Sequence, residues 1–183
     1  TASNLFSFGI DHQEQELRYS TFGALQTDTS RDNDGVYGVY IHENGPLDFT
    51  LSLRNDDNER FGNHSTGSIA VGSDFGESVR AWVSYGTAFK APNLIDLYVD
   101  FPSFFFFSNP NLKPETAESI ELSLQAEALG ATWQLNVFRN DIDDLISTDA
   151  TFTSLANIQQ ARIDGMEATV SSSIAGWRLD AAL

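Results

Sequence analysis

Apolar and polar residues alternate along most of this chain with a period of two. The clearest case is Leu47–Arg54, in which every odd position is apolar and every even position is polar. Successive side chains of a strand point to opposite faces, so this pattern predicts a strand with one apolar face and one polar face. The same alternation, sometimes weaker, recurs in the segments 6–11, 36–42, 67–74, 79–89, 119–125, 133–137, 167–171 and 177–181. The sequence therefore predicts about nine strands and one short helical turn near residues 92–97.

The connections between these strands alternate in length. Short turns are predicted at 43–46, 75–77, 128–131 and 174–176, and long polar connections at about 15–34, 55–65, 90–116 and 141–160. Strict alternation predicts an antiparallel up-and-down sheet with short turns at one rim and long loops at the other. Outer-membrane barrels have this layout, with short periplasmic turns and long extracellular loops.

The apolar face of such a sheet meets lipid in a membrane barrel, whereas in a soluble sandwich it faces the core. The period of the pattern is the same in both. Three features favour the barrel: strands longer than those of most soluble sheets, loops that alternate in length, and aromatic residues at strand ends. These aromatics are Phe8, Tyr40, Tyr85, Phe89, Trp133 and Trp177, and the polar face would line the lumen with Arg80, Ser84, Glu121, Gln134 and Asn136.

Composition narrows the function further. The chain has 183 residues, with 10 basic and 26 acidic side chains and a net charge of −16. This acidity argues against a nucleic-acid partner and against docking on anionic lipid headgroups. The absence of cysteine removes disulfides and thiolate catalysis. No run approaches the roughly 20 apolar residues that a membrane helix needs.

Motifs for catalysis or for a bound cofactor are also lacking. The sequence contains no G-x-S-x-G, Walker A or H-E-x-x-H motif, and His12, His42 and His64 do not have the spacing of metal ligands. We therefore expect a protein that is not an enzyme and has no cofactor.

Acidic residues cluster in three of the predicted loops. Carboxylate oxygens could bind calcium, but the spacing of an EF-hand is missing. We expect solvated loop charge, with sharing of divalent ions with lipopolysaccharide phosphates as the alternative. The clusters are Asp28, Asp32 and Asp34; Asp56 and Asp57; and Asp141, Asp143 and Asp144.

Four ordered segments resemble a known family. Residues Tyr85–Tyr98 resemble a segment of the TonB-dependent outer-membrane receptors, and the segments 109–116, 138–146 and 157–168 are similar to the motifs that follow it in that family. Upstream, Arg54–His64 is similar to the corresponding loop of the vitamin B12 (cobalamin) transporter branch. The resemblance covers nearly the whole chain.

The resemblance implies an all-β, antiparallel up-and-down transmembrane β-barrel of about 22 strands, of which residues 1–183 would supply about nine. The family's plug domain, through which the TonB complex acts, is not found in this sequence. The chain starts without an initiator methionine or signal peptide and stops in mid-pattern at Leu183, so we expect an internal piece of a longer protein. Its expected location is the outer membrane of a Gram-negative bacterium, in contact with lipid and lipopolysaccharide.

The implied function is TonB-energised import of a bulky, scarce nutrient. Cobalamin is the first choice of substrate, and a ferric siderophore or haem is the alternative. Two hypotheses come from other classes: a small self-contained structural barrel of the outer membrane, and a soluble β-sandwich that binds carbohydrate through exposed aromatics.

The candidate binding residues lie in the connection 90–116. Strand alternation cannot bury all of Phe104, Phe105, Phe106 and Phe107, so this run predicts an apolar patch that grips a large ligand such as a corrinoid or a siderophore. Tyr98 belongs to the same connection. The alternative is packing against neighbouring loops or the lipid rim.

Two further features of the sequence are expected to be architectural. The segment Asn109–Glu115 is predicted to return the loop rigidly to the next strand, because prolines fix φ and asparagines close local turns. Gly165 is predicted to mark a close approach or a bulge.

Overall fold

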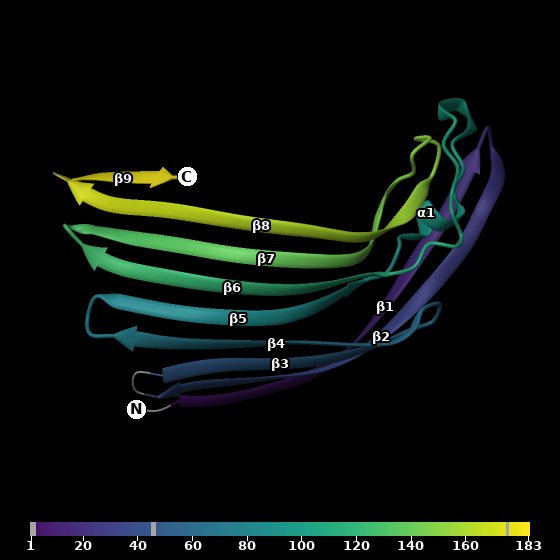
Figure 1. The fold of residues 1–183 in the computed structure, drawn as a ribbon. Helices are drawn as coiled ribbons and strands as arrows, with labels where there is room; N and C mark the ends of the chain where they lie inside the picture. The colour runs from purple at the N-terminus through teal and green to yellow at the C-terminus, as the bar shows by residue number, and fades with distance from the viewer. Residues whose placement is uncertain (1–2, 45–46, 175) are drawn as a thin grey trace.

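The computed structural model describes residues 3–44, 47–174 and 176–183. Its strands form a single antiparallel sheet in which spatial order equals chain order. The strands are β1 (Ser3–Thr21), β2 (Ala24–Asn44), β3 (Leu47–Asn58), β4 (Gly62–Phe75), β5 (Val79–Lys90), β6 (Glu115–Ala128), β7 (Ala131–Thr148), β8 (Leu155–Ile174) and β9 (Trp177–Ala182) (Figure 1). The predicted up-and-down topology is thus confirmed.

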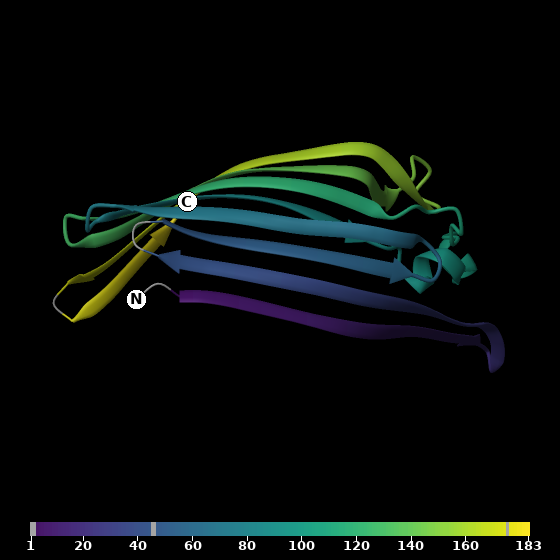
Figure 2. The same ribbon diagram turned by 90° about the horizontal axis from the view of Figure 1, so that it is seen from below.

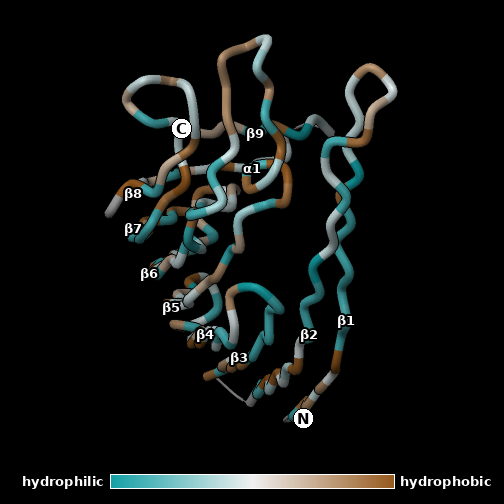
Figure 3. Tube along the Cα trace, turned by 90° about the vertical axis from the view of Figure 1, so that its right-hand side faces the viewer, coloured by the Kyte–Doolittle hydropathy of each residue, from teal (hydrophilic) through white to brown (hydrophobic). Residues whose placement is uncertain are grey.

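The sheet curls into an open arc rather than packing on a second layer (Figures 1 and 2). Seen along the strands, the arc has a concave side that holds the short helix α1 (Leu94–Tyr98) (Figure 3). No helix in the described ranges has the length and hydropathy needed to cross a bilayer.

The register of the sheet separates its two faces. Cross-strand partners share a face, and one row across β4–β8 is apolar at every position: Val71, Val83, Leu122, Val137 and Met166. The next row carries the opposite face and reads Gly72, Trp82, Ser123, Asn136 and Glu167. The apolar face is convex and open, while the polar face lies on the side of α1. This is the arrangement of a barrel wall in lipid, with its polar residues toward the lumen.

Three of the four predicted long loops are wrong, because strands run through them. β1 and β2 continue to a two-residue turn at residues 22–23, and β3 and β4 are joined by residues 59–61 alone. β7 and β8 leave only residues 149–154 between them. The fourth prediction holds, since residues 91–114 form a long connection that includes α1.

The physical reason is that these strand ends extend beyond the apolar band. Where water meets both faces, hydropathy no longer alternates, but the backbone ladder continues and polar cross-strand pairs replace apolar ones. On the convex side these pairs include His12 with Asp34 at 2.8 Å and Arg162 with Asp141 at 2.6 Å. A polar stretch was therefore mistaken for a loop.

The short turns at the opposite rim agree with prediction where they are described. Residues 76–78 and 129–130 connect their strands. The turns predicted at 43–46 and 174–176 include residues 45–46 and 175, which lie outside the described ranges.

A charged network ties β1, β2 and β3 together on the concave face. The Arg54 guanidinium lies between two carboxylates, with Nη1 2.7 Å from Asp11 and Nη2 2.6 Å from Asp56. Asp56 also accepts a hydrogen bond from Asn33 of β2, whose Nδ2 lies 2.7 Å away. Two carboxylates on one guanidinium form charge-assisted bonds that hold the three strands in register.

Gly165 makes a close approach, as predicted. It pairs with Phe138 across β7 and β8, and a Cβ at this position would lie 2.2 Å from the end of the Phe138 ring. The β7–β8 pairs keep one register on both sides of Gly165 among the described residues, so Gly165 marks a close approach and not a bulge.

Candidate functional site

The connection between β5 and β6 folds inward over the concave face at one rim of the sheet (Figures 1 and 3). Asn93 caps α1 through its side chain, which accepts the Asp96 N–H at 2.9 Å. Among the described residues, the buried hydrophobic side chains all belong to this connection: Leu94, Leu97, Val99 and Leu112. The connection therefore has a small core of its own, although the sheet beneath it is a single layer.

Strands β1 and β2 hold the near side of this connection. Arg31 of β2 donates from Nη1 to the Pro92 carbonyl at 2.8 Å, and Thr27 donates to the Tyr98 carbonyl at 3.2 Å. The rings of Tyr19 and Phe101 meet edge to face at 5.9 Å. The extended parts of β1 and β2, predicted as loop, are thus the wall against which the connection packs.

Two asparagines hold its far side. Asn109 donates from its side chain to the Leu155 carbonyl at 2.8 Å. Asn157 pairs with both backbone groups of Lys113, each at 2.9 Å, and also donates to the Asp144 carbonyl at 2.7 Å. The architectural role expected for Asn109–Glu115 is confirmed, with a tertiary clamp added to the local turn.

The five predicted binding residues occupy different environments. Phe101 and Phe106 exchange backbone hydrogen bonds of 2.8 and 3.2 Å, and the 3-10 turn η1 (Pro102–Phe104) lies between them. This hairpin leaves Phe104 79% and Phe105 75% exposed. Phe107 is partly exposed and its N–H bonds the Thr153 carbonyl, whereas Phe106 is half-buried.

Tyr98 differs from these phenylalanines in having a polar partner. It is half-buried, and its hydroxyl accepts a hydrogen bond from Arg60 in the β3–β4 turn. Phe104 and Phe105 are therefore the most accessible rings of the predicted set.

Two more phenylalanines stand exposed at tips of the same rim. Phe22 lies in the β1–β2 turn with φ of 51°, and Phe152 lies in the β7–β8 loop with φ of 57°. Phe105 shares this left-handed backbone, with φ of 53°. Residues other than Gly and Asn rarely adopt this backbone conformation. Three tips of one rim therefore each hold an exposed phenyl ring at some conformational cost. Neither Phe22 nor Phe152 is among the residues predicted from the sequence, because a single aromatic within a predicted loop does not stand out as the run at Phe104 does.

The predicted acidic clusters contribute to the charge pairs of the sheet. Asp28, Asp34, Asp56 and Asp141 lie in ion pairs. Within the described ranges, no group of three or more His, Cys, Asp or Glu residues has the arrangement of a metal site. Outside these clusters, hydrogen bonds from Thr151 and from the backbone of Thr153 and Ser154 hold the pKa of Asp149 below its usual value.

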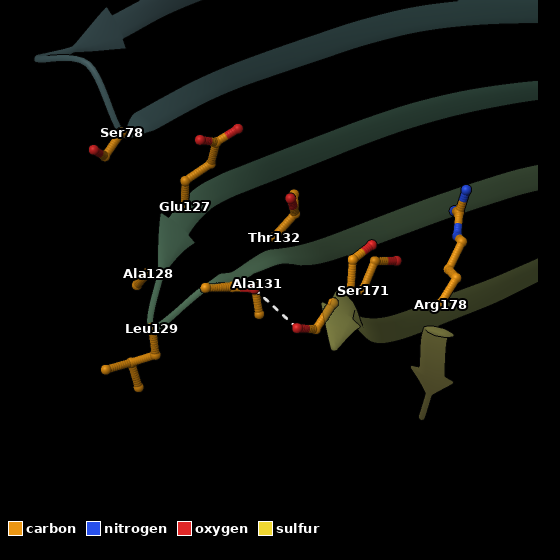
Figure 4. Close-up of a pocket in the computed structure, with 11 residues that line it drawn as sticks. Ser78, Glu127, Ala128, Leu129, Ala131, Thr132, Ser171 and Arg178 are labelled. Atoms are coloured by element: carbon orange, nitrogen blue, oxygen red, sulfur yellow. Dashed lines mark hydrogen bonds between the residues drawn. The ribbon is translucent and has the colours of Figure 1, made fainter. Parts of the chain in front are cut away.

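A polar hollow of about 670 Å³ lies at the opposite rim, between the β6–β7 turn and the start of β9 (Figure 4). Ser172 donates across it to the Gly130 carbonyl at 2.8 Å. Glu127 and Arg178 are its only charged lining residues among those described. It is separated from the aromatic loop by the length of the strands.

Comparison with known proteins identifies the fold. The family model for the TonB-dependent receptor-like β-barrel matches residues 3–183. The chain belongs to this family. The predictions of family and of an all-β barrel-type fold are thereby confirmed.

Solved structures of similar fold come from receptors and transporters. The siderophore receptor PirA from Pseudomonas aeruginosa shares 22% identity over 98% of this chain, with a TM-score of 0.84. The ferric enterobactin receptor PfeA from the same species, in complex with enterobactin, shares 20% identity over 95% of this chain, with a TM-score of 0.77. The FrpB iron transporter from Neisseria meningitidis shares 16% over 98%, with a TM-score of 0.74. The chain spans 36%, 33% and 32% of these three structures, respectively.

The clamp by Asn157 gives a first prediction. Asn157→Ala removes side-chain bonds to three backbone groups, a loss of about 2–3 kcal/mol at about 1 kcal/mol each. We expect the 91–114 connection to open more often, so that chymotrypsin cleaves the folded protein at its phenylalanines about tenfold faster or more. The matched control is Asn111→Ala, because Asn111 is exposed and contributes a backbone N–H to the local turn. Equal cleavage of both variants would show that Asn157 does not hold the connection.

Proposed function

We propose that residues 1–183 form part of the β-barrel of an outer-membrane active transporter in a Gram-negative bacterium. The transporter imports a bulky, scarce nutrient and is energised by the TonB complex through a plug domain. The observation that carries this proposal is the barrel-type sheet, apolar on its convex face, with a connection folded inward over the concave face at one rim. Membership of the receptor family supports the same conclusion.

The loop rim is the extracellular end in this proposal, and lipopolysaccharide surrounds it. Convex ion pairs lie above the apolar band on β7 and β8, where Arg139 contacts Asp164 at 2.6 Å. Exposed charges at this level suit the polar headgroup layer better than the hydrocarbon core. The short-turn rim then faces the periplasm.

Substrate capture is assigned to the exposed phenyl rings of this rim. Phe104 and Phe105 offer apolar surface for a ligand, and the less accessible Phe106, Phe107 and Tyr98 of the same connection complete the proposed set. Exposed rings on a rigid loop bind with little loss of conformational freedom. The small buried core of the connection supplies that rigidity.

A ferric siderophore is the substrate that we favour. Similar structures include receptors named for siderophores and for ferric enterobactin. Cobalamin remains the second candidate because Arg54–His64 resembles the B12 branch. However, Arg54 and Asp56 are engaged in the barrel-wall network, and residues 59–61 form a tight turn. This segment is thus largely used for architecture, which weakens it as a guide to the substrate.

Growth under iron limitation tests the proposed function. The intact gene that contains this segment is returned to a strain lacking it, with ferric siderophores as the sole iron source. We expect growth that requires both the gene and a working TonB complex. In the parallel culture limited for cobalamin, we expect no dependence on the gene. Growth that depends on the gene for cobalamin but for no ferric chelate would reverse the choice of substrate.

The phenyl rings give a separate prediction. The double variant Phe104→Ala/Phe105→Ala removes two apolar rings. A ring that the ligand buried fully would contribute about 1.5–3 kcal/mol. Partial burial of the two rings by the ligand therefore predicts about tenfold weaker binding of the transported chelate. The measurement is the dissociation constant of the purified receptor. Leu129→Ala, which alters an exposed apolar side chain at the opposite rim, is the control. Unchanged affinity in the double variant would exclude these rings from the site.

A further inference from the structure

The loop-side end of the sheet is divided between β4 and β5. Their ladder ends at the pair Ser68–Gly86, although β4 continues to Gly62 with β3 as its partner and β5 continues to Lys90 with β6 as its partner. Beyond the last pair, β5 runs toward α1, whereas β4 runs to the β3–β4 turn (Figure 1). We call this separation the β4–β5 fork. At the loop rim it divides the wall into two blocks of strands, β1–β4 and β5–β8.

The fork is not a general splaying of neighbouring hairpins above the membrane. β2–β3 and β6–β7 also join neighbouring hairpins of the loop rim, and they stay paired as far as Asn33–Asn58 and Thr116–Asp143. These last pairs lie at the end of β3 and one residue inside the start of β6. By contrast, residues 62–67 of β4 and 87–90 of β5 have no ladder partner in each other.

The fork begins at the upper edge of the apolar band. On the convex face, Ile69 and Tyr85 pair just below it, whereas Thr87 pairs with Glu118 above it. Backbone groups above this level meet water and not hydrocarbon. The two strands can therefore separate there without the high cost that unpaired backbone groups have in lipid.

Side chains, rather than a ladder, close the fork. The Thr87 hydroxyl accepts the Gly67 N–H at 3.1 Å, in the place that a backbone carbonyl would occupy. Farther toward the rim, the rings of His64 and Phe89, one from each block, stack with their centroids 3.7 Å apart. Gly67 and Gly86 lie where the strands diverge, and glycine is the residue at which a strand bends most readily. The fork is thus closed by side-chain contacts that can break without loss of a backbone ladder.

The connection between β5 and β6 bridges the two blocks. It is covalently part of the β5–β8 block, since it follows β5 directly and leads into β6. Its bonds to the other block come from β2, where Arg31 donates to the Pro92 carbonyl at 2.8 Å and Thr27 donates to the Tyr98 carbonyl at 3.2 Å. When these bonds break, the connection no longer ties β1–β4 to β5–β8.

We propose that the loop-side wall is a gate that opens along the β4–β5 fork, with its hinge at the two glycines. The bonds of Arg31 and Thr27 to the connection hold the gate closed, and the contacts of Thr87 and His64 across the fork stabilise the closed state. Opening widens the loop rim and leaves every pair inside the apolar band intact. The assignment rests on the proposed function in one respect, that the widened rim admits a bulky substrate.

Hydrogen exchange of the intact receptor, purified in detergent without ligand, tests the fork. Thr87→Val keeps the shape of the side chain but removes the acceptor of the Gly67 N–H. We expect the segment 62–67 to exchange about fivefold faster, as the loss of one hydrogen bond predicts, and the paired segment 69–74 to be unchanged. Thr66→Val is the control, because the Thr66 hydroxyl has no hydrogen-bond partner among the described residues. Exchange that is equal in both variants, or faster in 69–74 as well, overturns the gate.

A second variant tests whether the connection holds the gate. Thr27→Val removes the bond to the Tyr98 carbonyl, and we expect faster exchange in the segment 62–67, although β2 is not a neighbour of β4. Thr29→Val is the matched control, since Thr29 lies on the same face of β2 and its hydroxyl has no hydrogen-bond partner in the described part of the chain. Exchange of this segment at the unaltered rate in Thr27→Val overturns the role of the connection.

Cross-linking in cells tests whether opening serves transport. The pair His64→Cys/Phe89→Cys is bridged across the fork by a short, membrane-permeant and reducible bifunctional thiol reagent, and Ser73→Cys/Ala81→Cys, a pair within the ladder, is the control. The probe is a radiolabelled ferric catecholate siderophore. We expect the bridge across the fork to slow uptake about tenfold or more until a reductant is added, and the ladder bridge to leave uptake unchanged.

The contradicting outcomes differ for the two proposals. If the unaltered receptor takes up the probe and the bridge across the fork has no more effect than the ladder bridge, the gate is overturned and import stands. If the intact gene supports neither uptake of the probe nor growth on any ferric chelate, the proposed function is overturned. The exchange measurements, which need no substrate, then decide the fork by themselves.

Discussion

The fold depends on an uninterrupted antiparallel ladder of backbone hydrogen bonds. In lipid, an unpaired N–H or C=O costs several kcal/mol, so each strand must be paired along its whole length within the bilayer. The register of the ladder also decides which face each side chain occupies, because cross-strand partners share a face. Rows such as Val83, Leu122 and Val137 remain apolar from strand to strand only in this register, and a slip of one residue would turn them toward the lumen.

The same ladder positions the functional rim. β1 and β2 continue beyond the apolar band, and their polar ends form the wall that receives the 91–114 connection. Arg31 holds the connection to that wall on one side, and Asn157 holds it to β8 on the other. Burial of its own Leu97 and Leu112 side chains stabilises the connection. The exposed phenyl rings are therefore held on a rigid platform.

Much of this could be predicted from the sequence, and the failures have a common cause. Alternation located the strands that the structure describes, because inside the bilayer the two faces of a strand meet different solvents. Outside it, at residues 15–34 and 55–65, both faces meet water and hydropathy no longer reports the strand. The residues proposed to bind the substrate, and the contacts that hold their loop, could be predicted only in part. The run at Phe104 is conspicuous in sequence, but the support of its loop is not, because Arg31 lies on β2 and only the fold brings it to the Pro92 carbonyl.

The orientation of the sheet in the membrane is the claim on which the proposed capture of substrate depends. The chain contains no cysteine, so a single introduced thiol reports its own location. Phe105→Cys and Leu129→Cys, placed at exposed tips of the two rims, would be treated in intact cells with a maleimide that cannot cross the outer membrane. We expect the thiol at position 105 to be labelled and the thiol at position 129 to react only after the cells are opened. Labelling of position 129 but not of position 105 in intact cells would contradict this orientation.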